Sequence, residues 1–313
     1  MRIHTVTGII DTGELGETLF HEHIICTSPE FQRVFPDWLP RKKVVDIAVS
    51  KIKYAAEKFG IKTIFDATPL SLGRDIELLK EVSEKSEVQI VAATGFYCYD
   101  SFARHKLKVD FLADRLAEDA VNSHASLLKC AVGNDGLTPE AAKTLEVICA
   151  AHARTGLPVY IHTAAAAKSG WEAQKFVAGN NVAPEKTVIG HVSDSNDIEY
   201  PLELLKRGCY VSVDRIHPHN SEFILQLIKA GFADRVLVSH DHVCCYDTVM
   251  ENPDDRQNAP HGLDIVHGVI LPELRRSGVD EQTVKQLTTT NTARLFCGAA
   301  NREIPSETQA MCK

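Results

Sequence analysis

The sequence lacks the long apolar runs, the basic excess and the leader-like start that mark membrane, nucleic-acid-binding and secreted proteins. No stretch approaches the roughly 18 consecutive apolar residues of a transmembrane helix, so we expect no membrane-spanning segment. Acidic residues outnumber basic ones, 42 against 34, and the net charge of −8 argues against a surface that binds nucleic acid. Residues 1–5 contain no basic stretch followed by an apolar run, so we also expect no secretory signal.

Cysteine is present without a pattern, and the common catalytic signatures are missing. The nine cysteines are odd in number and scattered, and none forms a C-x-x-C pair. This usage excludes a disulfide framework and favours a reducing, cytoplasmic location. No G-x-G-x-x-G follows the first predicted strand, and neither G-x-x-x-x-G-K-[ST] nor G-x-S-x-G occurs. Dinucleotide binding, P-loop chemistry and α/β-hydrolase catalysis therefore lose their main support.

What the sequence does contain is an alternation of short β-rich runs with longer helical patterns. Helical periodicity is clear at residues 44–59 and at residues 138–153, where Thr138 is the expected N-cap and Pro139 the first helical residue. Strands and helices in strict alternation argue for a parallel sheet. We expect eight strands, near residues 17–23, 62–67, 89–94, 125–132, 158–163, 187–191, 210–214 and 235–241.

The spacing of these strands distinguishes a barrel from an open sheet. Successive strands follow at intervals of about 31 residues, which matches a (β/α)8 barrel of roughly 250 residues. No Pro/Gly/Ser-rich linker, charge block or low-complexity tract divides the chain. We therefore predict a single α/β TIM-barrel domain over residues 1–313, with its core at residues 3–298 and a polar tail at residues 299–313.

Residues that bind metals or move protons recur where the predicted strands end. His21 and His23 are two positions apart, so both project from one face of a strand. Strand ends of a barrel converge on one rim, where active sites are built. Taken alone, each such residue has a structural explanation, but their joint recurrence predicts a metal site. The other members of this set are Lys129, His162, His191, Asp214 and Asp241.

Histidines and carboxylates without paired thiolates favour zinc, manganese, cobalt or iron(II) over calcium or magnesium.

The motifs that contain these residues resemble, in order along residues 3–298, the phosphotriesterase-related branch of the amidohydrolase superfamily, which includes the phosphotriesterase-like lactonases. The resemblance implies a TIM barrel with a binuclear metal centre at the carboxyl ends of the strands and a hydrolytic activity. It is specific for the fold and the metal site and weaker for the substrate. The motifs are residues 18–23 (TLFHEH), 66–68 (DAT) with 73–75 (GRD), 94–97 (TGFY), 189–191 (IGH) with Asp194, 213–215 (VDR), and 239–241 (SHD) with 244–245 (CC).

The resemblance also implies roles for single residues. Two divalent ions, zinc in the first place, would be bound, and a hydroxide between them would be the nucleophile at neutral pH. Asp241 would in addition take the proton and pass it to the leaving group. The more buried ion would be bound by His21, His23 and Asp241, and the more exposed one by His162 and His191.

Lys129 would bridge both ions as a carbamate formed with CO2. A plain ammonium group about 4 Å from a dication would be repelled by roughly 8 kcal/mol at an effective dielectric of about 20. An anionic carbamate reverses the sign of that interaction. The alternative is an unmodified Lys129 that points elsewhere.

For some residues near the predicted site, the sequence allows two different roles. Asp214 either relays protons or orients Arg215 in a buried ion pair, and we favour the structural role. His240 and His242 are expected to face away from the metals if Asp241 faces them. Tyr97 either covers the substrate or packs.

Arg215 and Arg256 are candidates for an anion clamp, with a solvated surface position as the alternative. Asp66, Arg74 and Asp75 are expected to be scaffold residues. Glu22, between His21 and His23, is expected to point to the opposite face of its strand.

The loops after the last two strands indicate the substrate. The loop at residues 215–220 is short, whereas relatives that hydrolyse long-chain acyl-homoserine lactones carry a longer and more apolar one there. The loop at residues 246–261 is polar. We therefore expect a small polar lactone, such as a sugar lactone with or without a phosphate. Phosphotriester and amide hydrolysis are alternatives, and a non-catalytic metal-binding barrel is the least favoured. No partner beyond this small molecule is expected, and a homodimer stays open.

Overall fold

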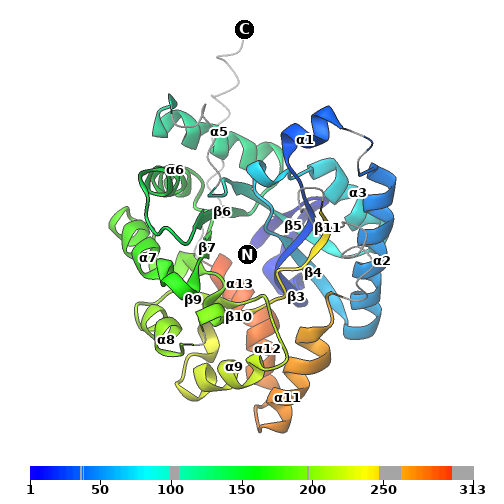
Figure 1. Ribbon diagram of the computed structural model, residues 1–313. Helices are drawn as coiled ribbons and strands as arrows, with labels where there is room; N and C mark the ends of the chain where they lie inside the picture. The colour runs from blue at the N-terminus through cyan, green and yellow to red at the C-terminus, as the bar shows by residue number, and fades with distance from the viewer. Residues whose placement is uncertain (36, 38, 99–105, 196, 247–261, 298–313) are drawn as a thin grey trace.

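Nine parallel strands of the described chain form one curved sheet, and helices surround it (Figure 1). The computed structural model describes residues 1–35, 37, 39–98, 106–195, 197–246 and 262–297. The strands are β3 (Glu17–Cys26), β4 (Ile61–Asp66), β5 (Gln89–Gly95), β6 (Leu127–Val132), β7 (Val159–Thr163), β8 (Thr187–Ile189), β9 (Tyr210–Val213), β10 (Val236–Val238) and β11 (Val243–Tyr246). Their order across the sheet is β10-β9-β8-β7-β6-β5-β4-β3-β11, with every neighbouring pair parallel.

The two outer strands of this order, β10 and β11, belong to one short stretch of chain, and this closes the sheet into a barrel. The residues between them bond to both sides. Ser239 N donates to Val213 O over 3.3 Å, and Asp241 N donates to His21 O over 2.9 Å. His23 N donates to the carbonyl of His242 over 2.8 Å. The (β/α)8 fold class is thereby confirmed, but the expected strand at residues 235–241 is shortened to β10, and the unpredicted strand β11 follows it.

Helices cover the outside of the barrel, and two of them show why the sequence folds in this way. The helix expected from residue 138 is α6, where Thr138 Oγ1 accepts from Ala141 N over 3.2 Å and Pro139 opens the helix. The helix expected at residues 44–59 begins earlier, at Arg41, and buries its apolar face. The α-helices are α1 (Pro29–Val34), α2 (Arg41–Phe59), α3 (Ile76–Ser86), α5 (Val109–Asn122), α6 (Pro139–Thr155), α7 (Ser169–Gly179), α8 (Glu199–Lys206), α9 (Asn220–Lys229), α11 (Leu271–Arg276), α12 (Glu281–Lys285) and α13 (Asn291–Phe296).

Short elements escaped the sequence prediction. Strands β1 (Arg2–Thr5) and β2 (Gly8–Asp11) form an antiparallel hairpin before the barrel, and β11 follows the break in the eighth strand. Four residues are too few for a periodicity to separate a strand from a loop. Two π-helical turns, η7 (Val266–Ile270) and η8 (Gln286–Thr290), also interrupt the last helices.

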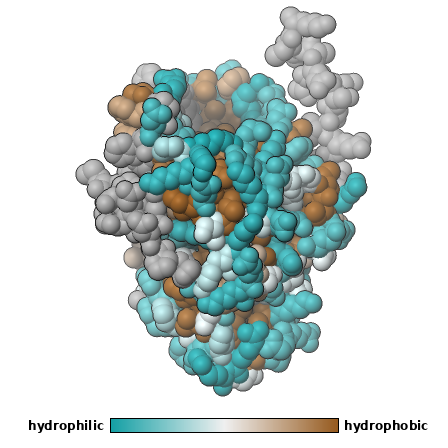
Figure 2. All heavy atoms as spheres, turned by 90° about the vertical axis from the view of Figure 1, so that its right-hand side faces the viewer, coloured by the Kyte–Doolittle hydropathy of each residue, from teal (hydrophilic) through white to brown (hydrophobic). Residues whose placement is uncertain are grey.

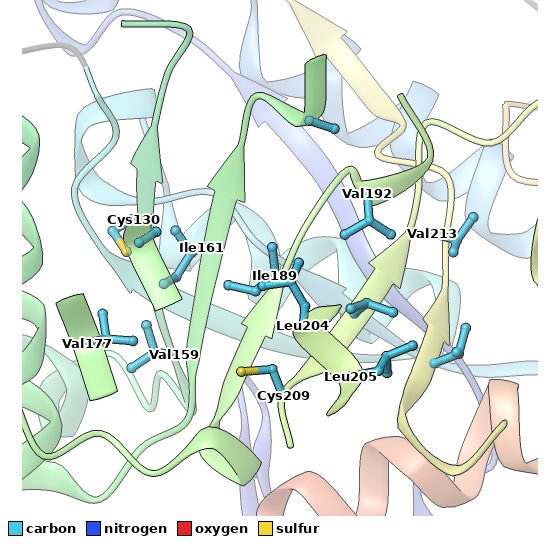
Figure 3. Packing of buried hydrophobic residues seen from close by; sticks show 14 of the residues in the cluster. Cys130, Val159, Ile161, Val177, Ile189, Val192, Leu204, Leu205, Cys209 and Val213 are labelled. Carbon is cyan, nitrogen blue, oxygen red and sulfur yellow. The ribbon is translucent and has the colours of Figure 1, made fainter. Parts of the chain in front are cut away.

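Alternation along β7 separates the inner core from the outer one. Val159 and Ile161 pack outward among the helices, whereas Tyr160 belongs to the cluster inside the barrel. Figure 3 shows the outer layer, where Ile161 and Ile189 lie on the side of the strands that faces the helical segments. His162, two residues after Tyr160, therefore faces the barrel interior.

A bulge lets β3 direct more side chains inward than strict alternation allows. The register between β3 and β4 shifts between Leu19 and Glu22, where Leu19 pairs with Ile64 and Glu22 with Asp66. Phe20, before the shift, packs in the inner core. The shift lets His21 face inward as well, as bulges beside active sites commonly do.

Two observations concern the surface and the described part of the chain. Among the described residues, no helix is long and apolar enough to cross a membrane. Figure 2 shows a face that is largely hydrophilic, with hydrophobic atoms in separate patches. The predicted tail at residues 299–313 and the anion-clamp candidate Arg256 lie outside the described residues.

The close approach of β5 to β6 gives a test of the barrel. Gly95 has a φ of +136°, and a Cβ atom there would lie 1.9 Å from the Lys129 carbonyl oxygen. We expect Gly95→Ala to lower the free energy of unfolding by about 2–5 kcal/mol, because a left-handed backbone and a clash with a strand add together. Denaturant unfolding followed by circular dichroism measures this loss.

Gly60→Ala is the matched control, because Gly60 also has a positive φ, +73°, but open space around its Cβ position. Only the backbone penalty of about 1–2 kcal/mol applies there. Equal losses in the two variants would contradict the clash at Gly95.

Candidate metal centre

Ionisable side chains from several strands meet at the carboxyl end of the barrel. His21 and His23 lie in β3, and Lys129 lies in β6. Parallel strands bring their carboxyl ends to one rim, so these side chains converge although they are far apart in the sequence. The set is completed by His162 at the end of β7 and by the residues that follow β8, β9 and β10, which are His191, Asp214 and Asp241.

The inner atoms of this set lie within a few ångströms of one another. Lys129 Nζ is 2.8 Å from His21 Nε2, and Asp241 Oδ1 is 3.3 Å from the same nitrogen. The same carboxylate oxygen is 3.2 Å from His23 Nε2. His162 and His191 face each other, with Nδ1 and Nε2 2.7 Å apart. All the residues predicted to bind metal are thus close to at least one other member of the set.

In three of the histidines, the ring nitrogen that faces away from the shared space, Nδ1, has a hydrogen-bond partner. His21 Nδ1 donates to Asp214 Oδ2 over 2.7 Å, and His191 Nδ1 donates to Asp214 Oδ1 over 2.6 Å. His23 Nδ1 is 2.8 Å from Thr68 Oγ1. A proton on each Nδ1 leaves a lone pair on each Nε2, directed at the shared space, which is the arrangement typical of histidines that bind metals.

Asp214 itself is saturated with donors. Besides the two rings, it accepts from His191 N over 2.9 Å, from Ser212 Oγ over 2.8 Å and from the Tyr160 hydroxyl. Burial would raise the pKa of this carboxyl, but the charges and hydrogen bonds of His191 and His21 hold it well below its usual range. Asp214 therefore orients histidines.

Arg215 pairs with other carboxylates, which corrects the expectation that Asp214 orients it. Its Nε donates to Asp241 Oδ2 over 2.9 Å, and its Nη1 donates to Asp194 Oδ2 over 3.1 Å. Burial opposes the charge, but Asp241 and Asp194 raise the pKa of Arg215 further. The ion pairs among the described residues include none between Asp214 and Arg215.

Backbone strain is concentrated here. His191, Arg215 and Asp241 have positive φ angles of 61°, 55° and 54°. Such conformations are unfavourable for residues with a Cβ atom and cluster at functional sites. They also explain why β8 and β10 end before the predicted strand ends at residues 191 and 241.

The donor set fits a divalent cation, and His21, His23 and Asp241 form one group that could hold it. Metal ligands must be deprotonated, and burial followed by the charge of Lys129 lowers the pKa of His21 to about 3. Burial and the neighbouring His191 also lower the pKa of His162. For His23, burial is outweighed by Cys26 and Asp241, which raise the pKa to about 10. His23 therefore has to lose a proton to become a ligand, and a cation bound between His23 Nε2 and Asp241 Oδ1, which are 3.2 Å apart, would replace that proton.

The remaining candidates near the site have the following contacts. The Tyr97 hydroxyl lies 3.2 Å from both ring nitrogens of His162, so Tyr97 reaches the site. His240 Nδ1 donates to Glu22 Oε1 over 2.8 Å, and His242 Nε2 is 3.1 Å from Lys51 Nζ. The contacts of His240 and His242 agree with the expectation that they turn away from Asp241.

The expected scaffold residues bond to the backbone around the site. Asp66 accepts from Ile24 N over 2.8 Å and from Thr68 N over 3.0 Å. Arg74 donates to Ala93 O over 3.0 Å, and Asp75 caps α3 by accepting from Leu78 N over 2.9 Å.

Sequence reasoning missed the supporting roles of Thr68 and Tyr160. Tyr160 lies two residues before His162, so strand alternation could have placed it on the same face. The support of His23 by Thr68 connects two different strands, and no local pattern reports such a contact.

Comparison with known proteins gives the chain its relatives. The model of the phosphotriesterase family matches residues 1–296. A phosphotriesterase homology protein from Mycobacterium tuberculosis is 32% identical, with 94% of this chain and 97% of that protein aligned. An aryldialkylphosphatase from Saccharolobus solfataricus is 28% identical, covering 92% and 96%. An N-acetyltaurine hydrolase from Mus musculus is 24% identical, covering 91% and 95%. The similarity therefore extends over nearly the whole length of these relatives.

The saturated carboxylate of Asp214 predicts how stability depends on pH. Its pKa is lower in the folded than in the unfolded chain, so it stabilises the fold above about pH 4 and this contribution is lost as the pH falls through the folded pKa. We expect Asp214→Asn to lower the free energy of unfolding of the metal-free protein near pH 7 by about 3–5 kcal/mol. The difference from the wild type should shrink below about pH 4. Denaturant titrations at several pH values measure it.

Asp66→Asn is the control, because burial raises the pKa of Asp66 and its ionised form is less favoured in the fold. The loss at pH 7 should be smaller for Asp66→Asn than for Asp214→Asn. The reverse order would contradict the electrostatic role of Asp214.

Proposed function

The chain belongs to the phosphotriesterase family, and we propose that it is a binuclear metal hydrolase that cleaves the ester bond of a small polar lactone. The protein is a hydrolase of ester or amide bonds, as its named relatives are, and the family is metal-dependent. The lactone, a sugar lactone with or without a phosphate, is the proposed part.

The observation that carries this proposal is the orientation of the histidine rings. Asp214 accepts hydrogen bonds from the Nδ1 atoms of His21 and His191, and Thr68 contacts Nδ1 of His23. The Nε2 atoms of the three rings are left to face the proposed ions. We assign the more buried ion to His21, His23 and Asp241. The more exposed ion is assigned to His162 and His191, and Lys129 is the bridge between the two ions.

Lys129 is suited to modification by CO2. Burial is the main cause that lowers the pKa of this amine to about 8, so a substantial fraction is neutral near physiological pH. The neutral amine adds to the carbon of CO2 and loses a proton. The product is a carbamate anion, which attracts cations where the ammonium would repel them.

The chemistry divides between the cations and the side chains around them. Two bound cations would lower the pKa of water to make a nucleophile and polarise the oxygen under attack. Asp241 stays ionised at neutral pH, because neighbouring histidines outweigh its burial and hold its pKa well below the usual range. It is therefore available to accept a proton and return it to the leaving group.

Arg215 and Tyr97 are proposed to handle the substrate. The bond from Arg215 Nε fixes the Asp241 carboxylate, and the Nη2 of this guanidinium stays available for a substrate oxygen. The Tyr97 hydroxyl beside His162 can donate to the oxygen of the scissile carbonyl. Arg256 remains a second candidate for binding an anionic group.

The loop after β9 favours a small substrate. The chain between β9 and α9 is only residues 214–219, which adds little apolar wall.

Two alternatives share the same centre. The aryldialkylphosphatase relative favours a phosphotriester, and the N-acetyltaurine hydrolase relatives favour an amide. A non-catalytic metal-binding barrel is the least favoured, because a structural site would be closed by protein ligands, whereas this donor set leaves room for water.

A substrate panel tests the proposal. With manganese or zinc and bicarbonate present, we expect the highest kcat/KM on plain or phosphorylated aldonolactones, above homoserine lactones, paraoxon-like triesters and N-acetyl amides. The physical reason is the short loop between β9 and α9, which provides little apolar wall for a larger and more apolar substrate. Asp241→Asn is the control that assigns turnover to this site. Turnover of triesters or amides without lactone cleavage would reverse the ranking.

Removal of the bridging lysine tests the centre itself. We expect Lys129→Ala to bind metal more than about 100-fold more weakly and to lose activity to the background rate, because the bridge between the ions is gone. Metal titration and bound-metal analysis measure this. Reconstitution of the wild type in bicarbonate-free buffer should also be slower.

Lys186→Ala is the matched control for the loss of a buried lysine. Lys186 Nζ donates to Leu295 O and Cys297 O, both over 2.7 Å, and is remote from the site. This variant should lose stability and keep its metal. Full activity in Lys129→Ala would remove the proposed bridge.

A further inference from the structure

Glu22 lies between His21 and His23 in β3, yet its carboxylate forms hydrogen bonds with a different part of the barrel. It is almost completely buried, with 2% of its surface exposed. As expected from its position, it points away from the histidines. There it meets the chain that joins β10 to β11, and this chain carries Asp241.

Four hydrogen bonds converge on the Glu22 carboxylate. Oε1 accepts from Ser239 Oγ over 2.7 Å, from His240 N over 3.0 Å and from His240 Nδ1 over 2.8 Å. Oε2 accepts from His242 N over 2.8 Å. The donors belong to the residues before and after Asp241, so Glu22 holds Asp241 on both sides without touching its side chain.

Residues 239 and 240 form further hydrogen bonds with neighbouring parts of the chain. His240 uses its second ring nitrogen, Nε2, to accept from Val266 N over 3.2 Å, which connects the segment to the turn η7. With Nδ1 donating to Glu22 and Nε2 accepting from Val266, the tautomer of His240 is fixed. Ser239 Oγ also accepts from His21 N over 2.9 Å. The segment is thus fastened to β3 at several points.

The segment needs such support because it departs from strand geometry. Asp241 has a φ of +54°, a conformation that a residue with a Cβ atom rarely adopts unless its surroundings impose it. This turn of the backbone is what directs Oδ1 to His21 and His23. A continuous strand over residues 235–241 would continue the ladder instead.

We propose that Glu22 is a positioning residue for Asp241. Its hydrogen bonds to residues 239, 240 and 242 hold the Asp241 carboxylate in its metal-binding position before a metal binds. The inference rests on the proposed function, since Asp241 must be a metal ligand for its position to affect metal binding. The competing explanation is that the bound cations pull Asp241 into place and that Glu22 only stabilises the barrel.

Glu22→Gln tests this with little change in size. The amide group must place a donor against either the His242 N–H or the donors at Oε1, so at least one hydrogen bond is lost. We expect the affinity for zinc or manganese, measured by chelator competition with metal-free protein, to fall about 10- to 100-fold, the range seen when the outer partners of metal ligands are removed. Unchanged affinity in a folded variant would overturn the proposal.

Glu17→Gln is the matched control. Glu17 lies on the same strand, and its Oε2 also contacts a histidine, His267 Nε2, at 3.2 Å, but it is remote from residues 239–242. A purely structural role would lower the unfolding temperature in both variants and leave both metal affinities intact. The proposal requires the loss of affinity in Glu22→Gln alone.

Hydrogen exchange of the wild type tests the proposal without a variant, should Glu22→Gln fail to fold. A preset segment protects the amides of His240 and His242 in the metal-free protein. Protection that appears only after metal is added would show that the cations position Asp241, and it would overturn the inference.

Asp241→Asn separates this inference from the proposed function. If Asp241→Asn weakens metal binding and Glu22→Gln does not, only the positioning role of Glu22 fails. If neither variant weakens it, Asp241 is not a ligand and the proposed centre fails as well.

Discussion

The buried carboxylate of Asp214 accepts one hydrogen bond from Nδ1 of His21 and another from Nδ1 of His191, and these two bonds determine which nitrogen of each ring faces the site. An imidazole can offer a lone pair to a cation only on the nitrogen that carries no proton. Thr68 fixes the ring of His23 in the same way. The charge of Asp214 is tolerated inside the barrel because five donors form hydrogen bonds with its carboxylate. The centre proposed for this protein depends on that arrangement.

The barrel supplies the geometry by interrupting its strands, not by extending them. Strands β8 and β10 stop early, and the residues that follow adopt the left-handed backbone that brings His191 and Asp241 to the centre. The break between β10 and β11 has two consequences. It closes the sheet, because its backbone bonds to β3 and β9, and it turns the Asp241 carboxylate toward His21. Closure of the fold and assembly of the site are therefore one structural event.

Much of this could be predicted from the sequence, and the exceptions have physical causes. Regular spacing of apolar runs was sufficient for the (β/α)8 fold, and the resemblance to the phosphotriesterase family is confirmed by the match over residues 1–296. The residues expected to bind metal do converge, because barrel strands share one rim. The partners of Asp214 could not be predicted, since most of them come from β3, from β7 and from the residue His191 after β8, and no spacing records contacts across a barrel. The end of β10 was predicted too late because the polar residues 239–241 directly follow an apolar run, and β11 was missed because four residues are too few for a periodicity.

Arg215 limits how a proton can leave the site. Its guanidinium bonds Asp241 and Asp194, and the two carboxylates raise its pKa further, so it cannot give up a proton and pass one between them. If Asp241 takes a proton as proposed, Arg215 therefore offers that proton no path to Asp194. In a lactone the leaving oxygen is tethered to the acyl group under attack and stays within reach of the same carboxylate. A proton kept beside Asp241 suits a substrate whose leaving group does not diffuse away, and this supports the proposed ranking of a lactone above a triester.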